Sequence, residues 1–496
     1  MNIWETIYPL YMIPVIGFVI LMIIPFNTTK NKIRGKQIAL MTSILTFMES
    51  LRLWMKFDNT TSEFQFVISL KWLLNSETGD YSSILLGIDG ISLFYIILTT
   101  LLIPICLLAS WDSVKILDKT YLLCFIGLEI LLIGVFTILD ILGFYILFEG
   151  VLIPMYLIIG IWGSRKEKVT AAYYFFFYTL IGSVLMLVGI LYIFNVAGTT
   201  DYLSLLGYEF DEVVQRWLFL SFFASLAVKI PKFPFHIWLP QAHVEAPVAG
   251  SVILAGVLIK LGGYGFIRFT LPLLPLGTAY FTPLVFTLAV LAIIYASMTT
   301  LRQTDLKRII AYSSVSHMGV VTLGIFSCSI IGIEGSIFLQ LAHGLVSSAL
   351  FIIVTILYDR HHTRLVKYYR GVTITMPIYS SLFLFFTLAN IGAPLTCNFI
   401  GEFLCLLATF EVNTFVAVFG CLGMILSACY ALFLYNRVAF GTMSKYIENS
   451  TENRDINRRE FYVLLPLVVL TILLGIGPNF IFDTMHISVT NLITYI

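Results

Sequence analysis

The chain has 496 residues, of which 59% are hydrophobic and only 11% are charged. Soluble globular domains carry about 25% charged residues. This composition excludes an ordinary soluble domain and predicts a protein with many membrane-spanning segments. The 29 basic residues nearly balance the 28 acidic residues, so the charge gives no support for nucleic-acid binding.

A cleaved targeting segment is not expected at the amino terminus. A secretory signal peptide carries its positive charges before its apolar core, whereas here the first basic cluster, Lys30 to Lys36, follows the first apolar stretch. No Arg- and Ser-rich transit segment precedes it. We expect direct membrane insertion, which fits a bacterial, chloroplast-encoded or mitochondrially encoded protein.

The seven cysteines form no C-x-x-C pair and lack the spacing of zinc or iron–sulfur ligands. Most lie in apolar runs, which predicts buried, unreactive thiols. No glycine-rich phosphate loop and no nucleophile elbow is present. We therefore expect no metal or redox cofactor in this chain, and any electron transfer would run through other subunits.

A transmembrane helix needs about 20 predominantly apolar residues. The fifth candidate span follows the fourth with almost no loop, and the twelfth is too long for one plain helix. The prediction is an all-α polytopic membrane protein of about 14 transmembrane helices, at residues 8–26, 38–56, 89–109, 120–138, 140–162, 170–195, 215–238, 247–270, 279–299, 308–328, 330–357, 374–408, 412–436 and 461–481.

The distribution of basic residues supports this count, because loops on the inner side of a membrane carry an excess of Lys and Arg. With the amino terminus outside, the loops that follow odd-numbered spans hold 21 of the 29 Lys and Arg residues. Segment 57–88 alternates polar and aromatic residues and would lie outside, where we expect a small hairpin. The acidic segment 200–214 would lie on the same side.

Helix-breaking residues interrupt two spans. The seventh contains Pro231 and Pro234, and the twelfth contains Gly392 and Pro394. Proline removes a backbone hydrogen bond, and broken helices at corresponding places in two halves of a membrane protein point to inverted repeats. The alternative is that these are ordinary proline kinks.

The two breaks lie five spans apart, and an odd offset inverts the topology. We therefore predict four parts. An amino-terminal unit contains spans 1–3 and the hairpin, two inverted five-helix repeats contain spans 4–8 and 9–13, and a basic loop precedes the last helix. The corresponding residues are 1–119, 120–270, 279–436 and 437–496.

Six ionisable residues fall near the middles of the predicted spans. Charge at the centre of a bilayer is costly and indicates a functional site. At about 1.5 Å per helical residue, several of these side chains lie roughly 15 Å from a membrane surface, so they share a plane and would form a polar row. Histidine titrates near neutral pH, and burial moves lysine and glutamate toward it. We predict proton transfer by Glu149, Lys229, Lys260, His317, His343 and Glu402.

Five of these six residues also have a structural interpretation. Glu149 and a lysine could form a static buried pair, Lys229 could be a cation at a helix end, and both histidines could be satisfied core side chains. Glu402 could cap the half-helix after the second break. Near the first break, His243 and Glu245 resemble a metal pair only superficially, because prolines prevent a single helical face and no third ligand is apparent. A proton-uptake site or a structural turn is expected there.

Several long runs resemble the antiporter-type, proton-translocating membrane subunits of respiratory NADH:quinone oxidoreductase. They include the runs around Lys229, Lys260, His317 and His343, at residues 226–231, 236–247, 250–256, 260–262, 305–318, 343–351 and 358–361. The runs LGIDGIS at 86–92 and FIGEF at 399–403 are most similar to the subunit 4 branch of the mitochondrial enzyme. The resemblance is strong over residues 85–445 and weak at both ends.

The resemblance implies fourteen helices with two inverted repeats, a half-channel in each repeat and a polar axis that contains the six midplane residues. It implies the mitochondrial inner membrane as the location, with other membrane and peripheral subunits as partners. One neighbour would contribute a long lateral helix. NADH, FMN, iron–sulfur clusters and ubiquinone would bind to partner subunits.

Two residues depart from the pattern of the family. Lys232 stands where relatives commonly have an apolar residue, and it would either face inward near Lys229 or reach the matrix surface. Leu395 follows Pro394 where many relatives have Gly or Pro, which leaves the shape of the second break open.

The sequence thus predicts a proton-pumping core subunit of respiratory complex I, in which Glu149 and Lys229 form a switchable pair. The alternatives are a stand-alone cation/proton antiporter of the same fold, a structural spacer between subunits, and the chloroplast homologue. A sodium requirement in transport would favour the antiporter. Normal turnover after neutral substitution of all six residues would favour the spacer.

Overall fold

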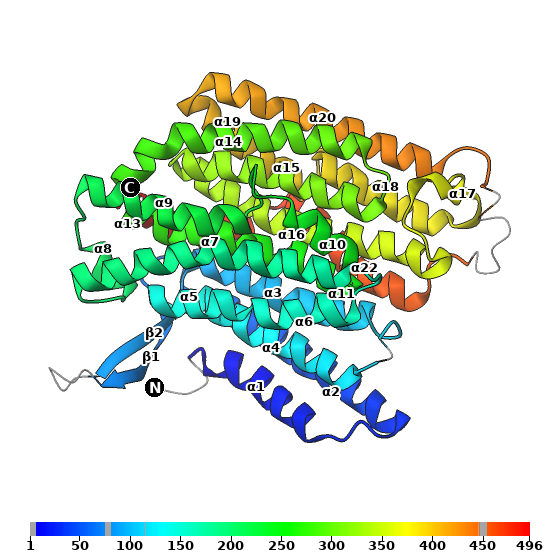
Figure 1. Cartoon of the computed structure of the whole chain (residues 1–496), viewed down its shortest axis with the longest axis horizontal. Helices are drawn as coiled ribbons and strands as arrows, with labels where there is room; N and C mark the ends of the chain where they lie inside the picture. The colour runs from blue at the N-terminus through cyan, green and yellow to red at the C-terminus, as the bar shows by residue number, and fades with distance from the viewer. Residues whose placement is uncertain (1–5, 75–80, 115, 445, 447–453) are drawn as a thin grey trace.

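The computed structural model describes residues 6–74, 81–114, 116–444, 446 and 454–496. Most helices run roughly along the long axis of the molecule, and a two-stranded hairpin projects at one end (Figure 1). We call this the hairpin end. The opposite end, where loops rich in Lys and Arg connect the helices, is called the basic end.

The amino-terminal unit consists of three helices and the hairpin. Helices α1 (Tyr8–Ile23) and α2 (Thr29–Lys56) pack against each other, and α3 (Gly90–Ala109) packs against α2. Strands β1 (Gln65–Leu74) and β2 (Tyr81–Ile88) pair in antiparallel fashion. The hairpin expected within residues 57–88 is therefore confirmed.

The next run of helices contains the first break. The expected span 140–162 is two helices joined at Val151, and the expected span 215–238 ends as a regular helix at Lys229. The elements are α4 (Asp118–Thr137), α5 (Ile141–Gly150), α6 (Leu152–Trp162), α7 (Lys168–Ala197), α8 (Tyr202–Leu206), α9 (Glu212–Lys229) and α10 (Trp238–Glu245).

The span after the first break, Val248–Leu273, alternates between α-helical and π-helical turns. π-Helical turns inside α-helices are frequent at functional sites. Here they precede and follow the short segment that carries Lys260. The elements are α11 (Val248–Ile253), η2 (Leu254–Leu258), α12 (Ile259–Gly265), η3 (Phe266–Thr270) and α13 (Leu271–Leu273).

The remaining helices contain the second break, between Ile391 and Cys397. Gly392 and Leu395 in this break have φ angles of +79° and +72°, a conformation that is uncommon for a leucine. The elements are α14 (Pro275–Arg302), α15 (Leu306–Phe326), α16 (Ile330–His361), η4 (Val366–Tyr368), α17 (Val372–Thr375), α18 (Pro377–Ile391), α19 (Cys397–Val412), α20 (Thr414–Ala439), α22 (Arg458–Ile476) and α23 (Asn479–Ile493).

Within the described residues, 11 helical segments are long and apolar enough to cross a membrane, and two shorter apolar helices are α1 and α18. The chain is a polytopic, helical membrane protein. Both expected breaks are present. The expected count of about 14 spans stays a prediction, because it depends on α1 and on the two interrupted pairs, α9–α10 and α18–α19.

The centre of the bundle is formed by α15, α16 and the span Val248–Leu273, which are buried along almost their whole length (Figure 1). By contrast, α7 and α20 have much of their apolar surface exposed, as expected for helices that face lipid. Ionisable side chains on the central helices therefore face protein rather than lipid, which is the arrangement that intramembrane charges require.

Candidate functional site

Four of the six expected residues lie next to one another in the centre of the bundle. Lys260 Nζ on α12 is 2.9 Å from His343 Nδ1 on α16. The His343 ring centroid is 5.5 Å from that of His317 on α15. His317 Nδ1 is in turn 2.9 Å from Glu402 Oε1 on α19. We call these four residues the central row.

The central row is closed off from solvent and lipid. Lys260 and His343 are fully buried, and the exposed fractions of His317 and Glu402 are 4% and 2%. Lys260 also donates a hydrogen bond to the Ala255 carbonyl oxygen in the π-helical turn η2. The local helix geometry therefore directs the ammonium to one side of its helix, toward His343.

The second break lies directly against the end of this row. A Cβ atom added to Gly392 would lie 2.7 Å from Glu402 Oε2, so no side chain fits between the break and the carboxylate. Glu402 lies in the second turn of α19, beyond the first turn in which the helix dipole acts most strongly. The expected capping role is not seen, since no described side-chain hydrogen bond caps the amino terminus of α19.

Glu149 and Lys229 form a second, separate pair. Lys229 is 3% exposed and lies in the last turn of α9, where the helix dipole favours a cation. Its Nζ atom is 4.1 Å from the centroid of the Phe148 ring. Glu149 on α5 interacts with it electrostatically, but among the described ion pairs none joins the two residues. The two side chains therefore lie near each other but do not form a described ion pair.

Lys232 faces the interior of the protein, which is one of the two arrangements expected for it. It is 1% exposed, so it does not reach the matrix surface. Its Nζ atom also does not join Lys229 but lies among three phenylalanine rings of α9, η3 and α15. The proline-containing break turns the two lysines, three residues apart, to different sides.

A buried charged cluster lies at the basic end. Arg364, fully buried, donates a hydrogen bond to the Val244 carbonyl oxygen, and it is 3.4 Å from Glu245 Oε1 and 3.9 Å from Asp305 Oδ2. Lys307 Nζ donates to the Ala246 carbonyl oxygen at 2.9 Å. These contacts join the end of α10 to the start of α15.

His243 lies between this cluster and the central row. It is fully buried, stacks on Phe351 at 4.6 Å between ring centroids, and interacts electrostatically with Lys307 and Lys260.

The sequence did not single out Lys307 or Arg364, because charges near the ends of apolar segments look like ordinary loop charges. Within the described residues, no group of three potential metal ligands is present.

Arg364 provides a test of this cluster. We expect Arg364→Met to lower the amount of assembled protein, because removing one partner of a buried ion pair costs about 3–5 kcal/mol. Glu245 and Asp305 would lose their guanidinium partner. The measurement is the abundance and thermal inactivation of the native assembly. Lys367→Met, an exposed change in the same loop, is the control, and equal abundance of both variants would contradict the expectation.

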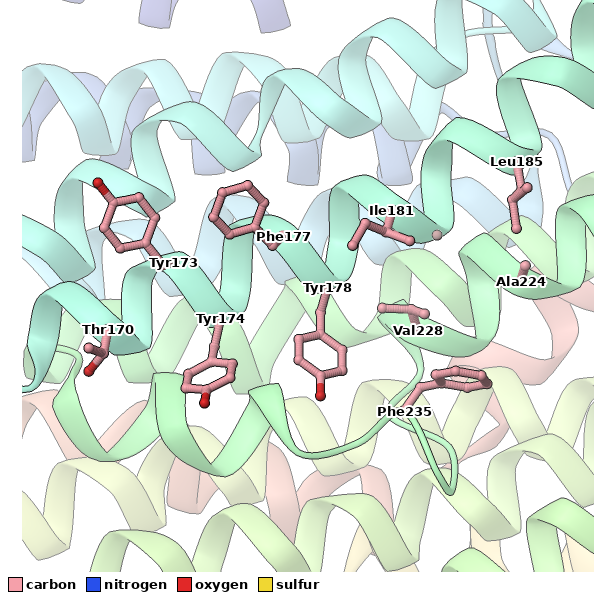
Figure 2. A pocket seen from close by; sticks show the side chains of 11 residues that line it. Thr170, Tyr173, Tyr174, Phe177, Tyr178, Ile181, Leu185, Ala224, Val228 and Phe235 are labelled. Atoms are coloured by element: carbon pink, nitrogen blue, oxygen red, sulfur yellow. The ribbon is translucent and has the colours of Figure 1, made fainter.

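An apolar groove of about 570 Å³ lies on the surface beside the first break. Figure 2 shows the side chains of Tyr174 and Tyr178 on α7 and of Phe235 in the break along this groove. No acidic, basic or histidine side chain lines it. The groove is therefore largely apolar, and the six expected residues do not line it.

The sequence also matches two family models. Residues 138–428 match the model described as NADH:quinone oxidoreductase/Mrp antiporter, TM, and residues 36–135 match NADH-ubiquinone oxidoreductase chain 4, amino terminus. A relative from Metridium senile named NADH-ubiquinone oxidoreductase chain 4 is 55% identical over 475 residues, which is 96% of this chain and 95% of the relative. The chain belongs to the NADH-ubiquinone oxidoreductase chain 4 family.

Other chain 4 proteins and solved structures agree with this assignment. The chain 4 protein of Marchantia polymorpha is 54% identical over 492 residues, covering 99% of this chain and 98% of the relative. A chain in the structure of respiratory complex I from Thermus thermophilus has a TM-score of 0.85 at 28% identity, with 98% of each chain covered. The protein is therefore a membrane subunit of complex I, as the resemblance of its motifs implied.

The same fold occurs outside complex I. A chain of the Mrp complex from a Dietzia species superimposes with a TM-score of 0.84 at 18% identity, covering 99% of this chain and 98% of that chain. This likeness concerns the fold alone. Chain 4 proteins thus share an antiporter-like architecture.

Proposed function

We propose that this chain 4 protein moves protons across the membrane through the central row, in step with NADH oxidation and ubiquinone reduction elsewhere in complex I. The observation that carries the proposal is the close succession of Lys260, His343, His317 and Glu402 inside the bundle. An amine, two imidazoles and a carboxylate follow one another in this row.

The row supports proton transfer by its geometry. Lys260 Nζ lies at hydrogen-bond distance from His343 Nδ1, and a proton can pass between groups at this distance. Glu402 at the far end can accept the proton after His317. Charged groups at this depth cannot reach water at the surface. A proton gained at one end of the row is therefore stabilised best by passing to the next group along it.

Glu149 and Lys229 would control the supply of protons to the row. When Glu149 approaches, its carboxylate stabilises the Lys229 ammonium; when it withdraws, the ammonium loses this partner and releases its proton toward Lys260. Among the described ion pairs none joins Glu149 to Lys229, and Lys229 Nζ instead lies 4.1 Å from the centroid of the Phe148 ring. Both observations fit the withdrawn arrangement. Movement in partner subunits would drive the change.

The two breaks support an organisation in two inverted five-helix repeats, residues 120–270 and 279–436, each with a half-channel. Lys229 ends the half-helix before the first break, and Glu402 lies near the start of the half-helix after the second.

The location and partners of the protein are inferred from its membership of the chain 4 family. We infer a location in the mitochondrial inner membrane, encoded in the organelle, with further membrane and peripheral subunits as partners and a lateral helix from one of them. Partner subunits would bind NADH, FMN, iron–sulfur clusters and ubiquinone. The chain itself contributes proton transfer and contacts with lipid.

Glu402→Gln tests the proposed function at the end of the row. We expect at least a roughly tenfold loss of NADH-driven proton pumping in membrane vesicles, because a positioned proton-transfer group contributes about 10²–10⁴-fold. Glu411→Gln, on the exposed part of the same helix, is the matched control. Normal pumping by a fully assembled Glu402→Gln enzyme would contradict the proposal.

A further inference from the structure

A pocket at the basic end lies apart from the central row and is lined by positive charge. It has a volume of about 470 Å³ and lies where α14, α15 and α20 meet the loop that contains η4. Three basic residues line it, namely Arg302 at the end of α14, Lys367 in η4 and Arg437 in the last turn of α20. Among the described residues that line this pocket, none is acidic. We call it the basic pocket.

The three positive charges have no carboxylate partner. Among the described ion pairs, none includes a basic residue of this pocket. Asp305 follows the lining residue Thr304, but its carboxylate is 3.9 Å from Arg364 and so already has a cationic partner. Unpaired charges of one sign repel one another, and an anion between them lowers this repulsion. The basic pocket is therefore complementary to a negatively charged ligand.

The two arginines are placed so that their hydrogen-bond donors stay free. Both lie in the last turns of their helices, where the helix dipole favours a cation. The guanidinium carbon of Arg437 is 6.0 Å from the centroid of the Phe433 ring, so a ring face rather than a polar group positions it. Among the described hydrogen bonds, neither guanidinium donates one. A guanidinium edge with free donors matches the geometry of a phosphate group.

The remaining wall of the basic pocket is mostly apolar and extends into the membrane-spanning part of α20. Phe433 is exposed, whereas Tyr430 and Leu434 are buried and form the inner wall. Phe433 and Tyr430 precede Arg437 by four and seven residues, which places them roughly 6 and 10 Å deeper in the membrane. Much of the surface of α20 is exposed, as for a helix that faces lipid. The pocket thus joins a cationic mouth to an apolar wall.

We propose that the basic pocket binds a phospholipid with an anionic headgroup, with the phosphate at Arg302 and Arg437 and an acyl chain along Phe433 and Leu434. Basic loops mark the inner side of a membrane, and basic pockets between transmembrane helices on that side bind anionic headgroups. An acidic segment of a partner protein would match the charges but not the apolar wall. Binding of the lipid involves no proton transfer, so the inference is independent of the proposed function of the central row.

The test uses assembled complex I in detergent and a phosphatidylglycerol with a photoactivatable group in one acyl chain. After illumination, the labelled peptides of α14 and α20 are quantified by mass spectrometry. We expect label on the peptides that contain Leu301 and Phe433, which are exposed side chains of the pocket. In the double variant Arg302→Gln/Arg437→Gln, this label should fall about tenfold or more, because each basic residue strengthens binding of an anionic lipid.

Two further double variants separate the charge of the pocket from a general effect of charge. Arg302→Lys/Arg437→Lys retains both charges and is expected to keep most of the label. Lys30→Gln/Arg34→Gln removes two exposed charges of α2 that do not line the pocket, and its label should be unchanged. All values are given per assembled complex on native gels, whose amount we expect to stay the same. Equal label in Arg302→Gln/Arg437→Gln and in the α2 control would overturn the inference.

Competition on the unchanged enzyme gives a second measurement that needs no variant. Unlabelled phosphatidylglycerol should displace the label, whereas phosphatidylcholine and inorganic phosphate at the same concentration should not. Equal displacement by phosphatidylcholine would mean that the headgroup charge is not recognised, and displacement by inorganic phosphate would indicate a site for a free anion. Absence of label from these peptides would mean that a neighbouring subunit covers the pocket. Each of these three results would overturn the inference.

Discussion

Lys260→Met is expected to stop proton pumping almost completely while the complex still assembles. Methionine has nearly the same length as lysine and no ionisable group, so the packing between α12 and α16 is kept while the contact with His343 is lost. Lys260 is the only described residue of the row on the span Val248–Leu273. A gap here separates the proton supply at Lys229 from both histidines.

The size of this effect follows from the position of Lys260. A positioned group that transfers a proton contributes about 10²–10⁴-fold, and Lys260 Nζ lies within hydrogen-bond distance of His343 Nδ1. The measurement is NADH-driven pumping per assembled enzyme. Lys56→Met, an exposed lysine at the end of α2, is the control. Pumping within twofold of the unchanged protein would show that the row is not the path.

Lys229 and Glu149 are expected to act as a unit. We expect Lys229→Met to lower pumping about as strongly as Lys260→Met, and Glu149→Gln to lower it less, because Lys229 can still carry a proton without its partner. The double variant should be no worse than Lys229→Met alone, since Glu149 acts only through Lys229. Residues that act together give such non-additive effects.

The double-variant cycle separates this account from a static pair. If Glu149 and Lys229 contributed independently, the logarithms of their effects on pumping would add in the double variant. Additive losses, or normal pumping by Lys229→Met, would contradict the switching mechanism. The amounts of assembled enzyme are compared on native gels, so that a folding defect is not read as a transport defect.

Much of the fold follows from the sequence, because a membrane restricts backbone structure so strongly. Lipid cannot satisfy backbone hydrogen bonds, so apolar segments of sufficient length become helices. The two breaks were predicted from Pro231, Pro234, Gly392 and Pro394, and both are present. The junction at Val151 was not predicted, although Gly150 precedes it and Pro154 follows it by three residues.

The membership of the central row was also accessible from depth alone, but its contacts were not. Span midpoints indicate which residues share a plane, and helical residues at one depth can still face different neighbours. The structure brings His317 to Glu402 and Lys260 to His343, while Glu149 and Lys229 remain apart. The π-helical turns on both sides of Lys260 have no sequence signal that we recognised.

Lys232 shows why side-chain direction is hard to predict near a break. On a continuous helix, residues 229 and 232 would lie on neighbouring faces. The backbone leaves the helix after Lys229, and Lys232 Nζ therefore lies among the rings of Phe223, Phe266 and Phe326. These rings come from three separate segments, so nothing in the sequence around Lys232 indicates them.

The most direct test of the central claim is proton pumping coupled to NADH oxidation in membranes that carry Lys229→Ala, with assembly checked on native gels. The account predicts that fully assembled enzyme loses coupled pumping, since the supply of protons to Lys260 is cut. Normal pumping in fully assembled enzyme would contradict it. Lys229 would then be a structural residue, and proton supply would have to be assigned to another side chain.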